Sequence, residues 1–537
     1  MLPTKQKSKV YVIGVGMTKF VKPGSIPNWD YPDMVKEAGK TFFIFLINKA
    51  LSDAKLQYSD VEQAAVGYIY GSTCCGQRAL YEIGLTGIPI YNVNNACASG
   101  STAVYLLKLL IEGGHADVAL AVGFEKMKSG SLESMESTGD RTHPLERHID
   151  VISSTYGLQP VPVMAQMFAN AGREHMEKYG TKREHFAKIA QKNHKHSVNN
   201  PNSQFQKEYS LGEIMNARII HDSMGLLECS PTSDGAAAVI LCSEQFLKKS
   251  PHLSKQAVEI IGAELGTDEP SVFAERSNLK MIGFDMIRKL SNRLYQTTNL
   301  TPNDIQVIEL HDCFAPNELI SYEALGKGGE IVDKGDNTYG GKWVINPSGG
   351  LISKGHPIGA TGVAQVVELS LQLRGLAGAR QVPNCKVAMQ HNIGIGGAGM
   401  IALYRLAEPS STTVKIPAKK IFLSDGIFDE IKERAKMEND LTQNINSSFR
   451  FILTGPDNAV KKWVVDCKVK PPVVIEMGEG DADVEMTMKD SDFIEIVNGK
   501  LRPDQAFLQR RLKIKGNLAK AMKLRTLLKS GLLKAKL

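Results

Sequence analysis

A loop of small residues, an amphipathic helix, a glycine turn and an apolar strand follow one another twice within residues 1–407. Apolar positions recur every three to four residues in the expected helices and run together in the expected strands. The first copy comprises Asn94–Gly100, Ser101–Glu112 and Val118–Val122, and the second comprises Gly355–Ala360, Thr361–Leu373 and Val387–Gln390. Repetition of this unit predicts an internally duplicated α/β fold.

Residues 143–200, between the two copies, are polar and predict helices at Met164–Tyr179 and Lys182–His196. The segment holds six of the twelve histidines. His194 and His196 are two residues apart, which places them on different helix faces, and no HExxH motif or carboxylate partner accompanies them. We therefore expect a solvated helix here and no metal site.

Composition changes near residue 410, where glycine-rich runs give way to the Pro/Ser/Thr stretch Glu408–Thr413 and then Pro417. Such a stretch between two patterned regions is typical of a linker. We predict one domain over residues 1–407, with a loop region at about 125–245, a linker at 408–417, and a second domain over 418–537.

The composition is that of a globular protein, with 42% hydrophobic and 23% charged residues in a chain of 537. The longest apolar runs are too short to cross a bilayer, and Met1–Lys9 is polar and basic, so no secretory signal is expected. Eight scattered cysteines without a CxxC pair indicate a reducing compartment. Together these features predict a soluble intracellular protein.

Charge is unevenly distributed near the C-terminal end. Residues 501–537 hold eleven Lys or Arg and one acid, a charge of +10, whereas residues 476–495 hold eight acids and one lysine. A basic segment suggests an anionic partner such as lipid headgroups, phosphorylated ligands or nucleic acid, although a solvated helix face has the same pattern.

Cys97 and His356 are a candidate nucleophile and base. Each lies in a loop of small residues directly before a predicted helix. Backbone N–H groups and the helix dipole at such a position favour the thiolate form of a cysteine. A histidine fixed between Gly355 and Pro357 can accept a thiol proton. A buried inert cysteine and a structural histidine are the alternatives.

Two further loops follow predicted strands, where α/β folds place ligands. His311-Asp312-Cys313-Phe314 comes after Ile305–Leu310 and supplies a second thiol beside a histidine and an acid. The other loop is His391–Gly399, whose glycines lack the clean G-x-G-x-x-G spacing of a nucleotide-binding turn.

The chain resembles the thiolase family over residues 10–407, in the order and spacing of Asn94–Gly100, Asn346–Gly350, Gly355–Gly362 and the late glycine loop. Conventional thiolases have Asn-Glu-Ala-Phe where this chain has His311–Phe314, and a cysteine loop where it has His391-Asn392. Both departures resemble the sterol-carrier-protein branch of the family. The resemblance implies an α/β thiolase fold of two duplicated halves with a helical loop domain.

The same resemblance implies an acyltransferase that cleaves 3-oxoacyl-CoA, with a branched-chain or sterol side-chain acyl group, to acetyl-CoA or propanoyl-CoA. It implies Cys97 as nucleophile, His356 as its base, and Cys313 as the second acid/base group, because the late loop has no thiol. It implies oxyanion and substrate contacts from His311, His356, His391 and Asn392 and from the backbone N–H groups of Cys97 and Gly394. CoA is then a co-substrate, no metal or other cofactor is implied, and a homodimer is expected.

Residues 428–537 resemble the sterol carrier protein type 2 lipid-binding domain, a small α+β module. The matching stretches are Trp463–Asp466, Met486–Phe493, Gly499-Lys500 and Leu512–Asn517. Arg510 stands where that family usually has glycine. The module is expected to bind a fatty acyl chain or a sterol, and its candidate contacts, which could also pack an ordinary core, are Phe493, Leu518, Met522, Leu524 and Leu528.

Fusions of this kind resemble peroxisomal proteins, and the chain ends in Ala535-Lys536-Leu537, a variant of the Ser-Lys-Leu peroxisomal address. This implies a peroxisomal location and recognition by the import receptor, with cytoplasm and mitochondrion as further locations. In this setting the basic end of the chain predicts contact with an anionic membrane surface and no nucleic-acid partner.

Two alternatives are compatible with the sequence. A lipid transfer protein with an inactive thiolase region has the same architecture, although Cys97, Cys313 and His356 are all present. A condensing synthase of the same fold is the other alternative, but such enzymes typically carry a different His/Asn or His/His set beside the first cysteine.

Overall fold

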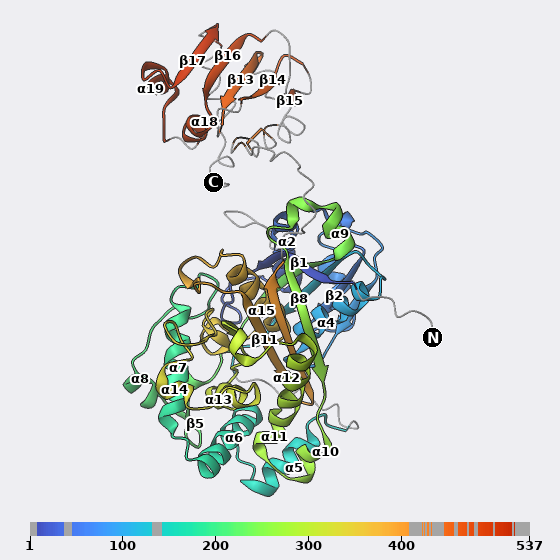
Figure 1. Ribbon diagram of the computed structural model, residues 1–537, viewed down its shortest axis with the longest axis vertical. Coiled ribbons are helices and arrows are strands. Elements are labelled where there is room, and N and C mark those ends of the chain that lie inside the picture. The colour runs from blue at the N-terminus through green and yellow to red at the C-terminus, as the bar shows by residue number, and fades with distance from the viewer. Residues whose placement is uncertain are drawn as a thin grey trace. The chain divides into compact units, whose positions relative to one another are not determined.

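The computed structural model describes residues 8–36, 46–130, 142–407, 422, 424, 427–428, 431, 445–455, 460–469, 472–476, 482–497, 500–517 and 520. The chain forms two units, Met1–Ser410 and Ser411–Leu537 (Figure 1). This division falls within the predicted linker, 408–417, whose own residues lie outside the described part of the chain. Among the described residues, no helix has both the length and the apolar character needed to span a membrane.

The first unit is built on a ten-stranded mixed sheet of order β10-β9-β11-β12-β8-β1-β7-β4-β2-β3. Its strands are β1 (Val10–Met17), β2 (Gln63–Gly67), β3 (Ile90–Val93), β4 (Val118–Glu125), β7 (Gly235–Ser243), β8 (Val258–Gly266), β9 (Val307–Glu309), β10 (Val344–Ile345), β11 (Val387–Gly394) and β12 (Ala398–Leu406).

The sheet consists of two halves with the same strand pairing. In β1-β7-β4-β2-β3 the central strand β7 is antiparallel to β1 and β4, and β2 and β3 continue in parallel. In β8-β12-β11-β9-β10 the same pattern recurs around β12. The halves join where Tyr11 and Val12 pair with Glu259 and Val258. The predicted duplication is therefore confirmed.

Helices cover the sheet and fill the space between its halves. In the first half they are α1 (Tyr31–Lys36), α2 (Leu46–Ala54), α3 (Cys75–Leu80), α4 (Ser99–Glu112) and α9 (Glu244–Lys249). In the second half they are α10 (Pro270–Ala274), α11 (Asn278–Met281), α12 (Phe284–Thr298), α13 (Ala315–Ala324), α14 (Ile331–Lys334) and α15 (Ile358–Leu373). Between β4 and β7 lie α5 (Glu146–Thr155), α6 (Val163–Tyr179), α7 (Arg183–Ser197), α8 (Leu211–Met215) and the hairpin β5 (Ile219–His221)–β6 (Met224–Gly225), so the expected loop region is helical.

The two predicted helices of the repeat, α4 and α15, pack against each other in the centre of the unit. α15 also packs on strands of both halves, and all but one of its residues are buried, including the polar Gln365, Glu368 and Gln372. The exposed face that an amphipathic helix would have is therefore covered here by other parts of the unit. The backbones of the two helices approach each other very closely. A Cβ atom at Gly100 would lie 2.5 Å from the Gly359 carbonyl oxygen, and one at Gly362 would lie 2.3 Å from the Ser101 amide nitrogen. Glycine at these positions is required because no side chain fits.

His194 and His196 are buried in α7, so the expectation of a solvated helix was wrong. His194 Nδ1 lies 3.1 Å from Ser353 Oγ, and His196 Nδ1 lies 2.9 Å from the Asn346 carbonyl oxygen. A loop about 150 residues further along the chain therefore covers this face of α7, which local sequence cannot reveal. Burial lowers the pKa of both imidazoles, to about 3 for His196.

The second unit is a five-stranded sheet of order β15-β14-β13-β16-β17 with two described helices, the small α+β module that the sequence predicted. Its elements are β13 (Ser448–Thr454), β14 (Val460–Asp466), β15 (Val473–Glu476), β16 (Val484–Lys489), α18 (Asp490–Val497), α19 (Pro503–Leu508) and β17 (Leu512–Gly516). Phe428 stacks on Trp463 and Phe493, with ring centroids 4.6 and 5.2 Å away. This unit therefore has a core of its own.

Arg510 occupies the left-handed position that ends α19. Its φ is 57°, its N–H donates to the Phe507 carbonyl (3.0 Å), and the Arg511 N–H donates to the Ala506 carbonyl (2.9 Å). This is the Schellman arrangement, in which glycine is usual because it adopts positive φ without strain. The left-handed turn at the end of α19 is thus made here by an arginine.

Replacing Arg510 with glycine should stabilise the second unit by up to about 1 kcal/mol, because the relief of left-handed strain exceeds the added freedom of the unfolded chain. The effect is measurable in the full chain as roughly fivefold slower hydrogen exchange of β16 and β17 amides. Arg502→Gly, at a position with φ −78°, is the matched control and should give no gain. Equal protection in the Arg510→Gly variant and the parent would show that the turn is unstrained.

Candidate active site

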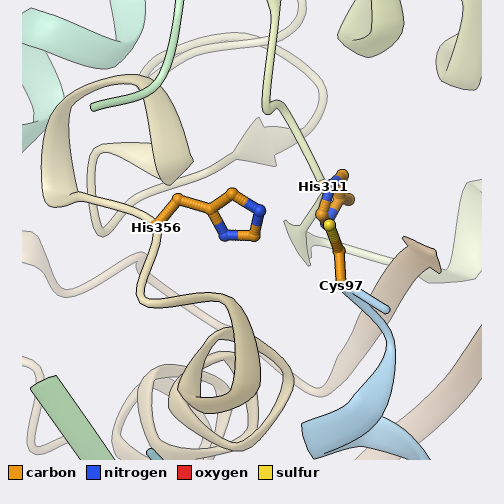
Figure 2. A group of neighbouring side chains, drawn as sticks. All are labelled: Cys97, His311 and His356. Carbon is orange, nitrogen blue, oxygen red and sulfur yellow. The ribbon is translucent and has the colours of Figure 1, made fainter. Parts of the chain in front are cut away.

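Three loops of the first unit converge on one point. Cys97 lies just before α4, His356 just before α15, and His311 just after β9. The Cys97 sulfur and one ring nitrogen of each histidine lie within 4.8 Å of one another (Figure 2). The two imidazoles meet edge to face, with centroids 5.1 Å apart. A thiol beside two imidazoles can act as a nucleophile with a base and a hydrogen-bond donor.

His356 is held by Thr361, five residues further along in α15. The Thr361 hydroxyl donates to the Pro357 carbonyl oxygen (3.1 Å) and lies 2.7 Å from His356 Nδ1. Because its proton is used for Pro357, the hydroxyl accepts Nδ1–H, and Nε2 carries the lone pair. Nε2 is buried with no hydrogen-bond partner among the described residues. Burial and the Lys354 charge lower the pKa of His356 to about 3, so the resting imidazole is neutral.

Cys97 is a thiol at rest, which corrects the expectation that its helix-start position favours the thiolate. The side chain is half-buried and packs against Ile69, Met127 and Ile358. Burial, and secondly the Glu125 carboxylate, raise the pKa of Cys97 to about 12. These tertiary effects exceed the opposing backbone hydrogen bond. Cys97 and His356 therefore form a neutral pair until a substrate arrives.

Glu125, at the end of β4, was not identified from the sequence. Its carboxylate accepts the N–H groups of Ile69 (3.1 Å), Tyr70 (3.0 Å) and Gly359 (3.0 Å), and so ties the end of β2 to the start of α15. Burial raises the pKa of this carboxyl to about 7. A single acid among apolar neighbours gave no pattern by which to find it.

His311 and Cys313 are fixed by the loops around them. Asn392 Nδ2 lies 3.3 Å from His311 Nδ1, and the His311 N–H donates to His391 Nδ1 (3.3 Å). Cys313 is buried, and burial together with the neighbouring Cys97 and Asp312 raises the pKa of its thiol well above the usual value. Asp312 in turn accepts the backbone N–H of Leu351 (2.6 Å). This hydrogen bond holds the turn Gly350–Lys354, which precedes His356, against the loop that carries His311 and Cys313.

Gly394 lies against the Cys97 loop, and the oxyanion contact of its backbone N–H stays a prediction. A Cβ atom there would be 2.2 Å from the Asn95 carbonyl oxygen and 3.1 Å from the Ala98 nitrogen. His391 is buried, and burial lowers its pKa to about 3, so it too is neutral. The structure thus brings His311 and His356 to Cys97, and places His391 and Asn392 against His311.

A buried ion pair supports the loop that carries His356. Lys354 Nζ lies 3.0 Å from Glu309 Oε2 and 2.7 Å from Ser348 Oγ, and the Ser348 hydroxyl donates to the same carboxylate (2.7 Å). Lys354 ends the π-helical turn Gly350–Lys354 directly before Gly355. Neither this pair nor Thr361 was singled out from the sequence, although Thr361 could have been found as a hydroxyl one turn beyond a loop histidine.

In the second unit, Phe493 is fully buried in the aromatic core. Its lipid contact stays a prediction. Leu518, Met522, Leu524 and Leu528, and the terminal Ala535-Lys536-Leu537, lie outside the described residues.

Family models match nearly the whole chain. The model of the thiolase N-terminal domain matches residues 10–245, that of the thiolase C-terminal domain-like family matches 271–403, and that of the SCP-2 sterol transfer family matches 428–529. Among similar proteins, "Sterol carrier protein 2" of Oryctolagus cuniculus is 54% identical, covering 97% of this chain and 96% of the relative. "Non-specific lipid-transfer protein-like 2" of Caenorhabditis elegans is 68% identical, covering 78% of this chain and all of the relative.

Solved structures share the fold of the first unit. The Ltp2-ChsH2(DUF35) aldolase matches with a TM-score of 0.62 at 22% identity, over 75% of this chain and 99% of that one. Human mitochondrial 3-ketoacyl-CoA thiolase in complex with CoA matches with a TM-score of 0.56 at 18% identity, over 75% and 98%. Because these structures are less than 25% identical to this chain, the matches establish the fold of the first unit and no more than the fold.

Thr361→Val should slow the alkylation of Cys97 by iodoacetamide about tenfold or more, because His356 loses the contact that presents Nε2 to the thiol. Thr361→Ser keeps the hydroxyl and should react within about twofold of the parent. Alkylation can be followed by peptide mass spectrometry. Unchanged alkylation in the valine variant would show that Thr361 has no part in orienting the base.

Proposed function

Because this chain belongs to the family of thiolases fused to an SCP-2 sterol transfer domain, we propose specific roles for its residues in the thiolytic cleavage of 3-oxoacyl-CoA. The enzyme is an acyltransferase joined to a lipid-carrier domain. The observation that carries the assignment is the convergence of Cys97, His311 and His356 within 4.8 Å, with Cys313 beside them.

In the first step Cys97 attacks the 3-keto carbon and its proton passes to His356 Nε2. The resting pair is neutral, so charge develops only as the carbon–sulfur bond forms and the substrate oxygen becomes an oxyanion. Donors aimed at that oxygen lower the barrier. We assign this role to the His311 and His356 rings and to the backbone N–H groups of Cys97 and Gly394.

Cleavage of the carbon–carbon bond then releases an enolate of acetyl-CoA or propanoyl-CoA, which needs a proton. Cys313 is a protonated, buried thiol next to Cys97, and so it is the group we assign as acid. In the second half of the reaction Cys313 takes the proton of free CoA, whose sulfur attacks the acyl group on Cys97. The acyl–Cys97 bond then breaks, and the departing Cys97 thiolate regains its proton from His356. CoA is thus a co-substrate, and these steps call on no metal or prosthetic group.

The acyl group of the substrate is proposed to be branched or to carry a sterol side chain. Ile69, Met127 and Ile358 provide an apolar surface at Cys97. The fused carrier unit supports a poorly soluble substrate, because a tethered lipid-binding unit raises the local concentration of its ligand. Its ligand is proposed to be a fatty acyl chain or a sterol, and its basic C-terminal residues are proposed to contact an anionic membrane surface, with an affinity that salt reduces.

A homodimer is also proposed. β3 is an edge strand of the ten-stranded sheet, and Tyr91 on it and the nearby Tyr81 and Leu85 are exposed. An unpaired edge with apolar neighbours is a template for pairing with a second copy.

Cys97→Ser should abolish acyl-enzyme formation and thiolysis, and Cys313→Ala should lower turnover about a hundredfold or more, as expected for a positioned acid/base group. A thiolysis assay with free CoA and intact-mass detection of the thioester measure both effects. Cys74→Ser, which changes an exposed cysteine, is the control and should retain activity. A parent chain that binds lipid but shows no thiolysis would instead establish a lipid transfer protein with an inactive thiolase region.

Peroxisomal location is proposed from Ala535-Lys536-Leu537, through binding to the import receptor. Deleting these three residues should move the protein from peroxisomes to the cytosol and leave thiolysis by the purified chain unchanged. Fluorescence microscopy of tagged chains, with the tag at the N-terminus, measures the shift. A truncated chain that still enters peroxisomes would refute the targeting role of these three residues. A full-length chain found in the cytoplasm or in mitochondria would refute the peroxisomal location itself.

A further inference from the structure

Cys97, His311 and His356 form a preassembled set of soft ligands at the centre of the first unit. We propose that these three side chains bind a soft divalent cation of the Zn²⁺ class, and that the bound ion inhibits the enzyme reversibly. The ligand atoms lie within 4.8 Å of one another (Figure 2), so small side-chain rotations bring all three to one ion. This goes beyond the thiolase reaction, which uses the same residues without a metal.

The donor set selects the ion. A thiolate and two imidazoles are typical zinc ligands, and three protein ligands leave a fourth position for water, as in catalytic zinc sites. Mg²⁺ and Ca²⁺ prefer oxygen ligands, which this cluster lacks. The site should therefore take Zn²⁺, and its spectroscopic substitute Co²⁺, and reject the hard cations.

A contact behind His356 already orients it as a metal ligand requires, and a contact behind His311 can do so after one side-chain amide turns over. Metal-bound histidines usually donate their other ring N–H to a neighbouring oxygen, which fixes the ring and its tautomer. His356 has this arrangement, since Nδ1–H donates to Thr361 Oγ1 at 2.7 Å and leaves Nε2 buried without a described partner.

Asn392 can do the same for His311. Its amide lies 3.3 Å from His311 Nδ1, and its Oδ1 has no hydrogen-bond partner among the described residues. Turning the amide over lets Oδ1 accept Nδ1–H, which leaves His311 Nε2 free for the ion. This turn gives up the present hydrogen bond from Asn392 Nδ2 to Gln365 Oε1 (3.4 Å), so metal binding has to offset its loss.

Binding of the divalent cation releases one proton from the site. The Cys97 thiol loses its proton to solvent as the metal–sulfur bond forms, and the two imidazoles stay neutral, so the occupied site carries one positive charge. Glu125 is the acidic side chain whose charge acts on Cys97, so the bound ion favours its ionised form. Metal and substrate exclude each other, because each needs the Cys97 sulfur.

Inhibition of the full chain by ZnCl₂ is the first test. At about 10 µM free zinc and low substrate we expect at least a tenfold lower thiolysis rate, which corresponds to a Kd of about 1 µM or below. EDTA should restore the rate, and MgCl₂ at the same concentration should leave it unchanged. A rate unaffected by zinc, or a loss that EDTA does not reverse, would overturn the proposal.

Binding itself is tested with CoCl₂ by optical absorption, which requires no enzymatic activity. One equivalent of Co²⁺ should give a thiolate-to-cobalt charge-transfer band in the parent. The band should disappear in Cys97→Ala and weaken in His311→Asn and His356→Asn. Cys74→Ser, an exposed thiol outside the cluster, should keep the band. A band that persists in Cys97→Ala, or disappears in Cys74→Ser, would place the ion elsewhere and refute the site. Circular dichroism confirms that each variant is folded.

Discussion

The glycine-mediated contact between α4 and α15 is the constraint on which the active site depends. Each helix begins directly after a catalytic loop, so the distance between the helices sets the distance between Cys97 and His356. Gly100 and Gly362 permit backbone-to-backbone approach at that contact. Gly359 adds a third close contact, since a Cβ there would lie 2.4 Å from the Phe124 carbonyl oxygen. A methyl group at any of them would separate the nucleophile from its base.

The duplicated sheet explains why these loops face each other. Cys97 precedes the helix between β3 and β4, and His356 precedes the helix between β10 and β11, so the two residues occupy equivalent places in the two halves. The remaining groups, His311 and Asn392, come from the ends of β9 and β11 in the second half only. The first half instead contains the long insertion between β4 and β7, whose helix α7 packs against the loop 346–353 and supports it. One half thus supplies the nucleophile, and the other supplies most of the proton-handling groups.

Much of this arrangement could be predicted from the sequence. Helices α4 and α15 begin within three residues of their predicted starts, and the motifs around Cys97, His311 and His356 come together as expected. The ionisation of Cys97 could not be predicted, because burial and Glu125 act on it through space. The burial of His194 and His196 in α7 was not predicted either, because the segment that covers them is distant in sequence. Thr361 was overlooked because a hydroxyl in the first turn of a helix is commonplace.

The neutral state of Cys97 also bears on its chemical durability. Peroxides oxidise the thiolate far faster than the thiol, and the first product, a sulfenic acid, leads on to irreversible forms. A cysteine with a pKa of about 12 is almost entirely protonated at physiological pH. The nucleophile is thus protected from oxidants in the interval between turnovers, because it forms a thiolate only when His356 takes its proton during attack on an electrophile.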